Sequence, residues 1–320
     1  MKNSKVIKQI LILEFGLYRK SPMYIFLSWI LALCLGIIWL EIRVGDPFVI
    51  SATIATLTIT NTTIVYLKSL NTHKQKQFYQ RLAYNKVSSF TYIFATMLFN
   101  FLINTIGSIL FFGVGLLYTE QLRYLTWFSL TIFFGAYLLF WLTCILFTYF
   151  CFSYIKSTVA CQILIVAFHM ITYNAMGCTF PFYSIVNIKV LNSLSYIMPN
   201  RLAMNFLQAS YVQAWNFDYV DVYFAGKYDL YWRIGTNLGL ILGLMFTIIG
   251  TLIILIVAKT LYLKRLKFKK LMILLEPELI WGKLKMLNHW QRLSNCKAIE
   301  LKRDQVHSKN LIMKRVKIKS

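Results

Sequence analysis

Charged residues are scarce in this sequence. Only 14% of its 320 residues are charged, 58% are hydrophobic, and the mean hydropathy is +0.60. A soluble domain carries about 25% charged residues. Lys and Arg are almost absent from two long stretches, 22–67 and 87–258. Because roughly 18 or more consecutive apolar residues suffice to cross a bilayer, these stretches exclude an ordinary soluble domain and indicate membrane spans.

Several chemical motifs are also missing. The six cysteines form no C-x-x-C pair and no His/Cys cluster, so the sequence predicts neither a metal site nor a disulfide framework. It contains no phosphate-binding loop of the form GxxxxGK followed by Ser or Thr. The nearest Gly-Lys pair, at Gly226, lacks the first glycine. We therefore expect no catalytic residue, no cofactor and no ATP-binding site in this chain.

The apolar stretches predict an all-α integral membrane protein with six transmembrane helices. The expected spans cover residues 23–40, 48–67, 89–117, 125–152, 158–176 and 234–258. Three regions follow from them: a cytoplasmic N-terminus with an interfacial helix at 1–22, a transmembrane domain at 23–260, and a basic cytoplasmic tail at 261–320.

The basic residues predict the orientation in the membrane. The sequence has 34 Lys and Arg against 11 Asp and Glu, and 17 of the 34 lie in 259–320. With the N-terminus inside, the inner segments carry 28 of them and the outer segments six. Positive charge gathers on the cytoplasmic side of membrane proteins, so we expect a cell membrane protein with both termini in the cytoplasm. A tail close to anionic lipid explains the net charge of +23 better than a nucleic-acid partner does.

Two segments fit neither a span nor a loop. Residues 6–18 are apolar but short and are interrupted by polar residues, which favours an amphipathic helix lying in the membrane interface. Residues 177–233 contain Pro181 and Pro199, with apolar residues at helical spacing between and after them. They predict two short half-helices that enter the outer leaflet before the last span.

Polar residues within the spans have two interpretations. Six threonines crowd the second span, where we expect their hydroxyls to bond to carbonyls of the same helix. His169 within the fifth span could bind a substrate or relay protons, but a hydrogen bond to a neighbouring helix is the simpler reading, as it is for Asn61, Asn104 and Gln162. Three glycines are expected at close helix contacts: Gly107, Gly113 and Gly115.

The order of these segments resembles the permease subunit of type-2 ABC transporters, a family of exporters. The resemblance covers residues 7–259. It rests on the interfacial segment LEFGLYRKSP at 13–22, the basic loop after the second span, and the run LNSLSYIMP at 191–199, which ends in proline before the last span. The loop HKQKQFYQRL at 73–82 departs from the family pattern because it has no acidic residue and no glycine.

The resemblance implies a function, partners and sites. Two permeases, identical or different, would work with two cytoplasmic ATPases to export a drug-, lipid- or saccharide-like substrate. Half-helices containing Pro181, Leu194 and Pro199 would form an outer gate. Residues that contact the ATPases or couple to them would be Glu14, Lys74, Lys76, Phe78, Tyr79, Arg81 and Leu82.

Other readings stay open at this point. The loop at 71–86 could be basic only because it is cytoplasmic. The chain could also be a membrane-embedded lipid-modifying enzyme, although the paired carboxylates, His clusters and Asp-rich motifs of that class are missing. A non-transporting membrane anchor is the third possibility, and it predicts an ordinary loop at 177–206.

Overall fold

The computed structural model describes residues 2–78, 82, 84, 85, 87–125, 127–223, 226–232, 237–262 and 265. The chain divides into two compact units, Met1–Val257 and Ala258–Ser320. Nearly all of the second unit, and with it the predicted basic tail, lies outside the described residues.

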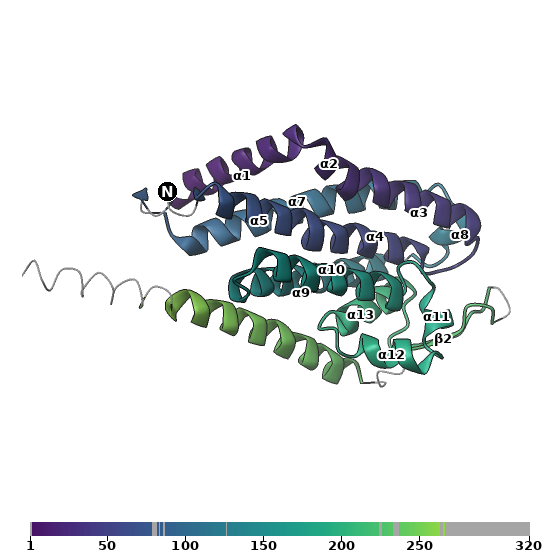
Figure 1. The fold of residues 1–320 in the computed structure, drawn as a ribbon. Helices are drawn as coiled ribbons and strands as arrows, with labels where there is room; N and C mark the ends of the chain where they lie inside the picture. The colour runs from purple at the N-terminus through teal and green to yellow at the C-terminus, as the bar shows by residue number, and fades with distance from the viewer. Residues whose placement is uncertain are drawn as a thin grey trace, which may run out of the picture. The chain divides into compact units, whose positions relative to one another are not determined.

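The described residues of the first unit are mostly helical (Figure 1). The spanning and connecting helices are α1 (Lys2–Lys20), α2 (Pro22–Ile25), α3 (Leu31–Ile42), α4 (Val49–Thr60), α5 (Tyr66–Gln75), α7 (Ser89–Gly115), α8 (Thr119–Leu122), α9 (Trp127–Tyr154) and α10 (Thr158–Ala175). Three short helices follow: α11 (Phe182–Ile185), α12 (Lys189–Ser195) and α13 (Arg201–Tyr211). Strands β1 (Asp218–Tyr219) and β2 (Leu230–Tyr231) pair antiparallel, with Asp218 opposite Tyr231.

Six helices among the described residues are long and apolar enough to cross a membrane, which confirms the predicted fold class. They are Pro22–Ile42, Val49–Gln75, Ser89–Gly115, Ser129–Tyr154, Thr158–Ala175 and Leu238–Tyr262. The second of them runs two turns beyond the predicted end at residue 67. Its last turns are polar in sequence, yet Leu70, Asn71 and His73 are buried by neighbouring helices rather than exposed in a loop.

The second spanning helix, Val49–Gln75, forms the axis of the bundle. In its most apolar stretch 94% of the residues are buried, against 22 to 44% in the other five helices. It comprises α4, the π-helical turn η2 (Asn61–Val65) and α5. The predicted threonine bonds are present, since hydroxyls along this helix donate to carbonyls four residues earlier: Thr53, Thr56, Thr58, Thr62 and Thr63. These internal bonds allow a hydroxyl-rich helix to stand in an apolar core.

Two of the three predicted glycine contacts are confirmed. A Cβ atom on Gly107 would lie 2.8 Å from Leu57 Cδ1, and one on Gly115 would lie 2.5 Å from Ile50 Cδ1. Both glycines let α7 approach α4 closely. Gly113 has open space where its Cβ would be, so the expectation of close packing there was wrong.

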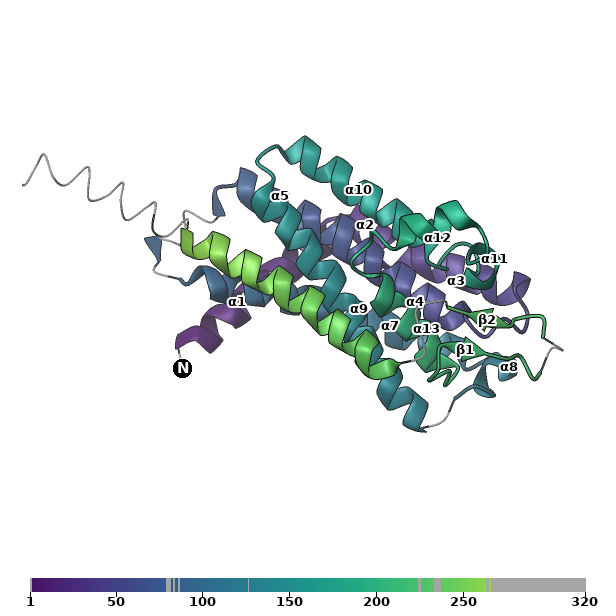
Figure 2. The same cartoon turned by 90° about the horizontal axis from the view of Figure 1, so that it is seen from below.

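The region expected to hold two half-helices contains three short helices and the β-hairpin (Figure 2). We call residues 177–232 the cap. Helix α13 is buried along its whole length and packs on α9 and α4. The ring of Trp232, 0% exposed, meets the edges of Phe48 and Phe217 at centroid distances of 5.7 and 6.2 Å. The cap is thus part of the hydrophobic core of the bundle.

Candidate functional site

Helix α1 turns one face into the bundle. Residues at four-residue spacing, Ile10, Glu14 and Tyr18, are buried against α7 and the central helix. Its outward face carries Ile12 and Phe15, 62% and 55% exposed. An apolar outward face beside basic residues is typical of a helix that also touches lipid, and the predicted interfacial placement stays a prediction.

Glu14 joins this helix to the central one. Its carboxylate is buried, with the side chain 3% exposed, and its Oε2 accepts a hydrogen bond of 3.0 Å from Ser69 Oγ on α5. Glu14 Oε1 lies 3.5 Å from His73 Nε2, and neither of these two atoms forms a hydrogen bond with a described residue. On the other side of the imidazole, Nδ1 lies 2.5 Å from the Tyr92 hydroxyl of α7. Glu14 thereby joins α1 to α5, and His73 joins α5 to α7.

Burial changes the protonation of this carboxyl group. Desolvation raises the pKa of Glu14 from 4.5 to about 7, and the Ser69 hydrogen bond opposes that rise. A buried ionised carboxylate costs free energy that a neutral one does not, so burial at this position favours the protonated form of Glu14.

The predicted coupling segment begins beside this carboxyl group. Helix α5 ends at a turn in which Gln77 has a φ of 52°, the left-handed conformation that reverses the chain after a helix. Phe78 then lies with its ring 4.9 Å from His73 and 5.8 Å from Tyr92, centroid to centroid. Leu82 is half-buried against the apolar group of residues around Ile10 and Tyr92.

We call Glu14, Ser69, His73, Phe78 and Tyr92 the α1–α5–α7 cluster. Two of its members, Glu14 and Phe78, were predicted site residues. Ser69, His73 and Tyr92 were not, although Ser69 and His73 stand four residues apart and so share one helix face. Two other predicted residues, Tyr79 and Arg81, lie outside the described residues.

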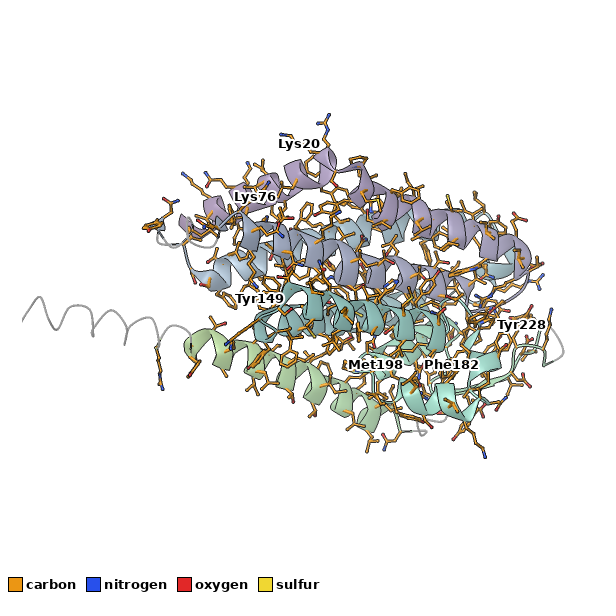
Figure 3. The ribbon with its side chains drawn as sticks, viewed as in Figure 1. Lys20, Lys76, Tyr149, Phe182, Met198 and Tyr228 are labelled. Carbon is orange, nitrogen blue, oxygen red and sulfur yellow. The ribbon has the colours of Figure 1, made fainter. Side chains whose placement is uncertain are left out.

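The predicted basic residues lie at the same end of the bundle. Lys74 and Lys76 are exposed, and Figure 3 shows Lys76 far from Phe182, Met198 and Tyr228 of the cap. The ammonium group of Lys74 lies 3.5 Å from the carbonyl of Lys156 and 5.7 Å from the centre of the Phe152 ring. The turn after α9 thus meets the end of α5, and the distribution of basic residues predicts a cytoplasmic location for both. We call these two segments together the basic end.

The predicted outer gate residues lie in the cap and are spread along it. Pro181 precedes α11, Pro199 precedes α13, and Leu194 is half-buried within α12. Beside them lies a buried arginine that the prediction missed. Arg201 is 2% exposed, its guanidinium carbon stands 3.7 Å from the centre of the Tyr196 ring, and Nη1 donates to the Asn192 carbonyl at 3.0 Å. Burial lowers the pKa of Arg201 from its ordinary value.

A network of amides occupies the middle of the bundle. Asn61 Nδ2 donates to Asn104 Oδ1 at 2.8 Å, and Asn104 Nδ2 donates to Asn100 Oδ1 at 2.9 Å. Asn100 Nδ2 returns a bond of 3.1 Å to the backbone carbonyl of Asn61, within the π-helical turn, and Trp141 donates to Asn100 from α9. Nearby, His169 Nδ1 lies 3.1 Å from Thr63 Oγ1. The simpler reading of Asn61, Asn104 and His169, as hydrogen bonds between helices, is confirmed.

The described residues contain no group of three or more His, Cys, Asp or Glu placed to hold a metal ion. The arrangement can hold a proton at Glu14 and transmit movement of α1 to the central helix. These features define a multi-pass helical membrane protein. A scan against protein-family models and searches of curated proteins and of solved structures found no match.

Proposed function

We propose that this chain is the membrane-spanning permease subunit of an ATP-driven exporter in the cell membrane, with both termini in the cytoplasm. A separate cytoplasmic ATPase supplies the energy, and two permease subunits, identical or different, form the path. The observation that carries the proposal is the link from α1 through Glu14 to the buried central helix, directly beside the exposed basic end.

This link suits the transmission of force. An ATPase that moved the basic end would displace Phe78, and with it His73 and Tyr92, whose rings it contacts. His73 belongs to the central helix, against which α3, α7, α9 and α10 pack. A displacement at one end would therefore reach the whole bundle, since packed helices move as rigid elements.

The cap also supports a transporter over a membrane anchor. The anchor alternative predicted an ordinary loop at 177–206, where α11, α12 and the first half of α13 stand instead. A polar and irregular segment at membrane depth has to be shielded by protein or water. Burial of Asn200, Arg201 and Asn205 inside the bundle meets this requirement.

The proposal is tested by reversing the exposed charges of the basic end. The double variant Lys74→Glu and Lys76→Glu, purified with the chains that bind it and reconstituted in vesicles, should lose about tenfold or more of the transport-stimulated ATP hydrolysis, because charge reversal opposes docking on acidic groups. Lys189→Glu, also exposed but at the cap, is the matched control and should leave hydrolysis unchanged. Equal hydrolysis in all three preparations, or a purified complex that hydrolyses no ATP, would contradict the proposal.

A further inference from the structure

An open, mostly apolar groove lies between α7 and α9. Its volume is about 250 Å³, and Ile54 of α4 forms part of its floor. Helices α7 and α4, and α9 and α4, pack on each other directly. The groove therefore lies against α4, with α7 and α9 as its walls.

The inner end of the groove is closed. The Thr105 and Tyr137 hydroxyls of the two walls lie 3.3 Å apart. One turn deeper on each helix, the rings of Phe101 and Trp141 meet at a centroid distance of 5.0 Å. Whatever enters the groove must therefore come from the other end or from the side.

The side of the groove faces lipid. Ile109 and Phe134 stand on its two walls and are 64% and 49% exposed, on helices that cross the membrane. Ser108 lies seven residues before the end of α7 at Gly115, and Phe134 seven residues after the start of α9 at Trp127. At 1.5 Å per residue both positions lie about 10 Å from the helix ends. Helices of 27 and 28 residues exceed a hydrocarbon core of about 30 Å, so the groove opens within the acyl-chain layer of the leaflet opposite to the basic end.

The lining favours a hydrocarbon occupant. None of the described residues that line the groove is charged. Thr105 and Tyr137 bond to each other, and Ser108 is the remaining polar residue of the lining. A bound water needs two to four polar partners, which the lining does not supply. The volume is also below the roughly 300 Å³ at which pockets for drug-sized molecules begin.

We propose that this groove is a binding site for one acyl chain of a phospholipid from the leaflet opposite to the basic end. The chain lies between α7 and α9 with its terminal methyl group toward Tyr137. The floor at Ile54 belongs to the central helix, and Phe133 on the α9 wall packs at 5.6 Å on Tyr211 of α13. The bound chain thereby fills the groove between α7 and α9, against the floor formed by the central helix. This inference does not depend on the proposed ATPase partner.

The proposal is tested with a phospholipid that carries a photoreactive diazirine near the end of one acyl chain. The full-length protein is reconstituted in phosphatidylcholine–phosphatidylglycerol vesicles containing a trace of this lipid, irradiated, digested and mapped by mass spectrometry. Adducts should concentrate at residues 105–112 and 130–137, about fivefold or more above those at residues 163–170 of α10, because a held chain reacts more often than a passing one. Ile163 and Met170 of α10 are 66% and 53% exposed, so they report ordinary lipid contact.

A variant that fills the groove sharpens the test. Ser108→Phe should reduce the groove adducts about tenfold and leave the α10 adducts unchanged, since added side-chain volume displaces the chain. Ile163→Phe is the matched control and should leave the groove adducts unchanged. The wild-type map decides the question even if Ser108→Phe fails to insert.

Two results would overturn the proposal. An even spread of adducts over all lipid-facing helices would show ordinary lipid contact only. Removal of the groove adducts by dodecyl maltoside below its micellar concentration, but not by an excess of unlabelled phospholipid, would assign the groove to a soluble amphiphile instead.

Discussion

The α1–α5–α7 cluster and the cap attach two non-spanning segments to the same bundle by different chemistry. The cluster holds α1 through a buried carboxyl group, an imidazole and two hydroxyls. The cap is attached by neutral groups: Gln208 donates to the Met176 carbonyl at 3.3 Å, Asn200 Nδ2 donates to Thr172 Oγ1 at 3.1 Å, and the Tyr211 hydroxyl donates to the Gln121 carbonyl at 3.3 Å.

This difference separates an adjustable contact from a fixed one. Amide, hydroxyl and carbonyl groups do not change charge near neutral pH, so these bonds of the cap do not depend on pH there. Burial raises the pKa of Glu14 to about 7, so the charge at the cluster does change near neutral pH.

The largest effect is expected from a variant that disrupts the cluster itself. Replacement of Phe78, Tyr79 and Leu82 together by Ala should abolish stimulated ATP hydrolysis while leaving membrane insertion intact. Phe78 contacts His73 and Tyr92, and Leu82 packs beside Ile10, so the variant removes the contacts that join the segment after α5 to α1 and α7. Hydrolysis in vesicles and the yield of inserted protein are the two measurements. Normal stimulation with normal insertion would remove the coupling role from this segment.

The next largest effect is expected from a variant that disrupts the packing of the cap. Trp232→Ala should lower the free energy of unfolding by about 3–5 kcal/mol, because it deletes a fully buried aromatic side chain. Thermal unfolding in detergent measures it. Tyr231→Ala, at the neighbouring position but 47% exposed, is the control and should cost far less. Equal losses in the two variants would mean that the cap is not part of the core.

A third experiment uses the pH dependence of stability to distinguish the α1–α5–α7 cluster from the cap. The folded-state pKa of Glu14 lies above its ordinary value of 4.5, at about 7. The folded state therefore binds the proton more tightly than the unfolded state does, and the stabilisation present below pH 4.5 is lost as pH rises through 7. We expect a loss of about 3 kcal/mol, at 1.36 kcal/mol for each pKa unit. Glu14→Gln keeps the side chain neutral, so its unfolding midpoint should lack this dependence between pH 4.5 and 8. Parallel curves for the two proteins would assign the pH dependence to another group.

The smallest expected effect tests whether polar contacts at the surface matter. The Tyr118 hydroxyl donates to Glu41 Oε1 at 2.5 Å, and this hydrogen bond is exposed. Tyr118→Phe should leave the unfolding midpoint within experimental error of the parent, since exposed contacts of this kind exchange freely with water. A clear drop would show that burial is not what distinguishes the strong contacts of this protein from the weak ones.

The spans were predictable because lipid imposes a simple rule on composition and length. The predicted and observed ends differ most at the second span, which continues to Gln75. The sequence near Asn71 is polar, and the prediction treated polarity as exposure. In the structure α1 and α7 bury this turn, so its polar side chains face partners rather than water.

The candidate site was predictable only in part. Glu14 stood out as an acidic residue within an apolar helix, and Phe78 as an aromatic residue within a basic segment. Nothing in the sequence indicates that Glu14 of α1 and Tyr92 of α7 meet the same turns of α5, at Ser69 and His73. Such a meeting depends on how α1 and α7 pack, and single-sequence patterns do not contain that packing.

The sequence alone determined that six helices form and which ends of them carry positive charge, because hydrocarbon rejects charged groups wherever the chain crosses it. Only the tertiary structure decided which helix became the axis, that one carboxyl group is buried beside an imidazole, and that α7 and α9 leave a groove between them. These outcomes depend on side-chain shape across helix pairs. Composition records how apolar a helix is, and it does not record which neighbour covers each of its faces.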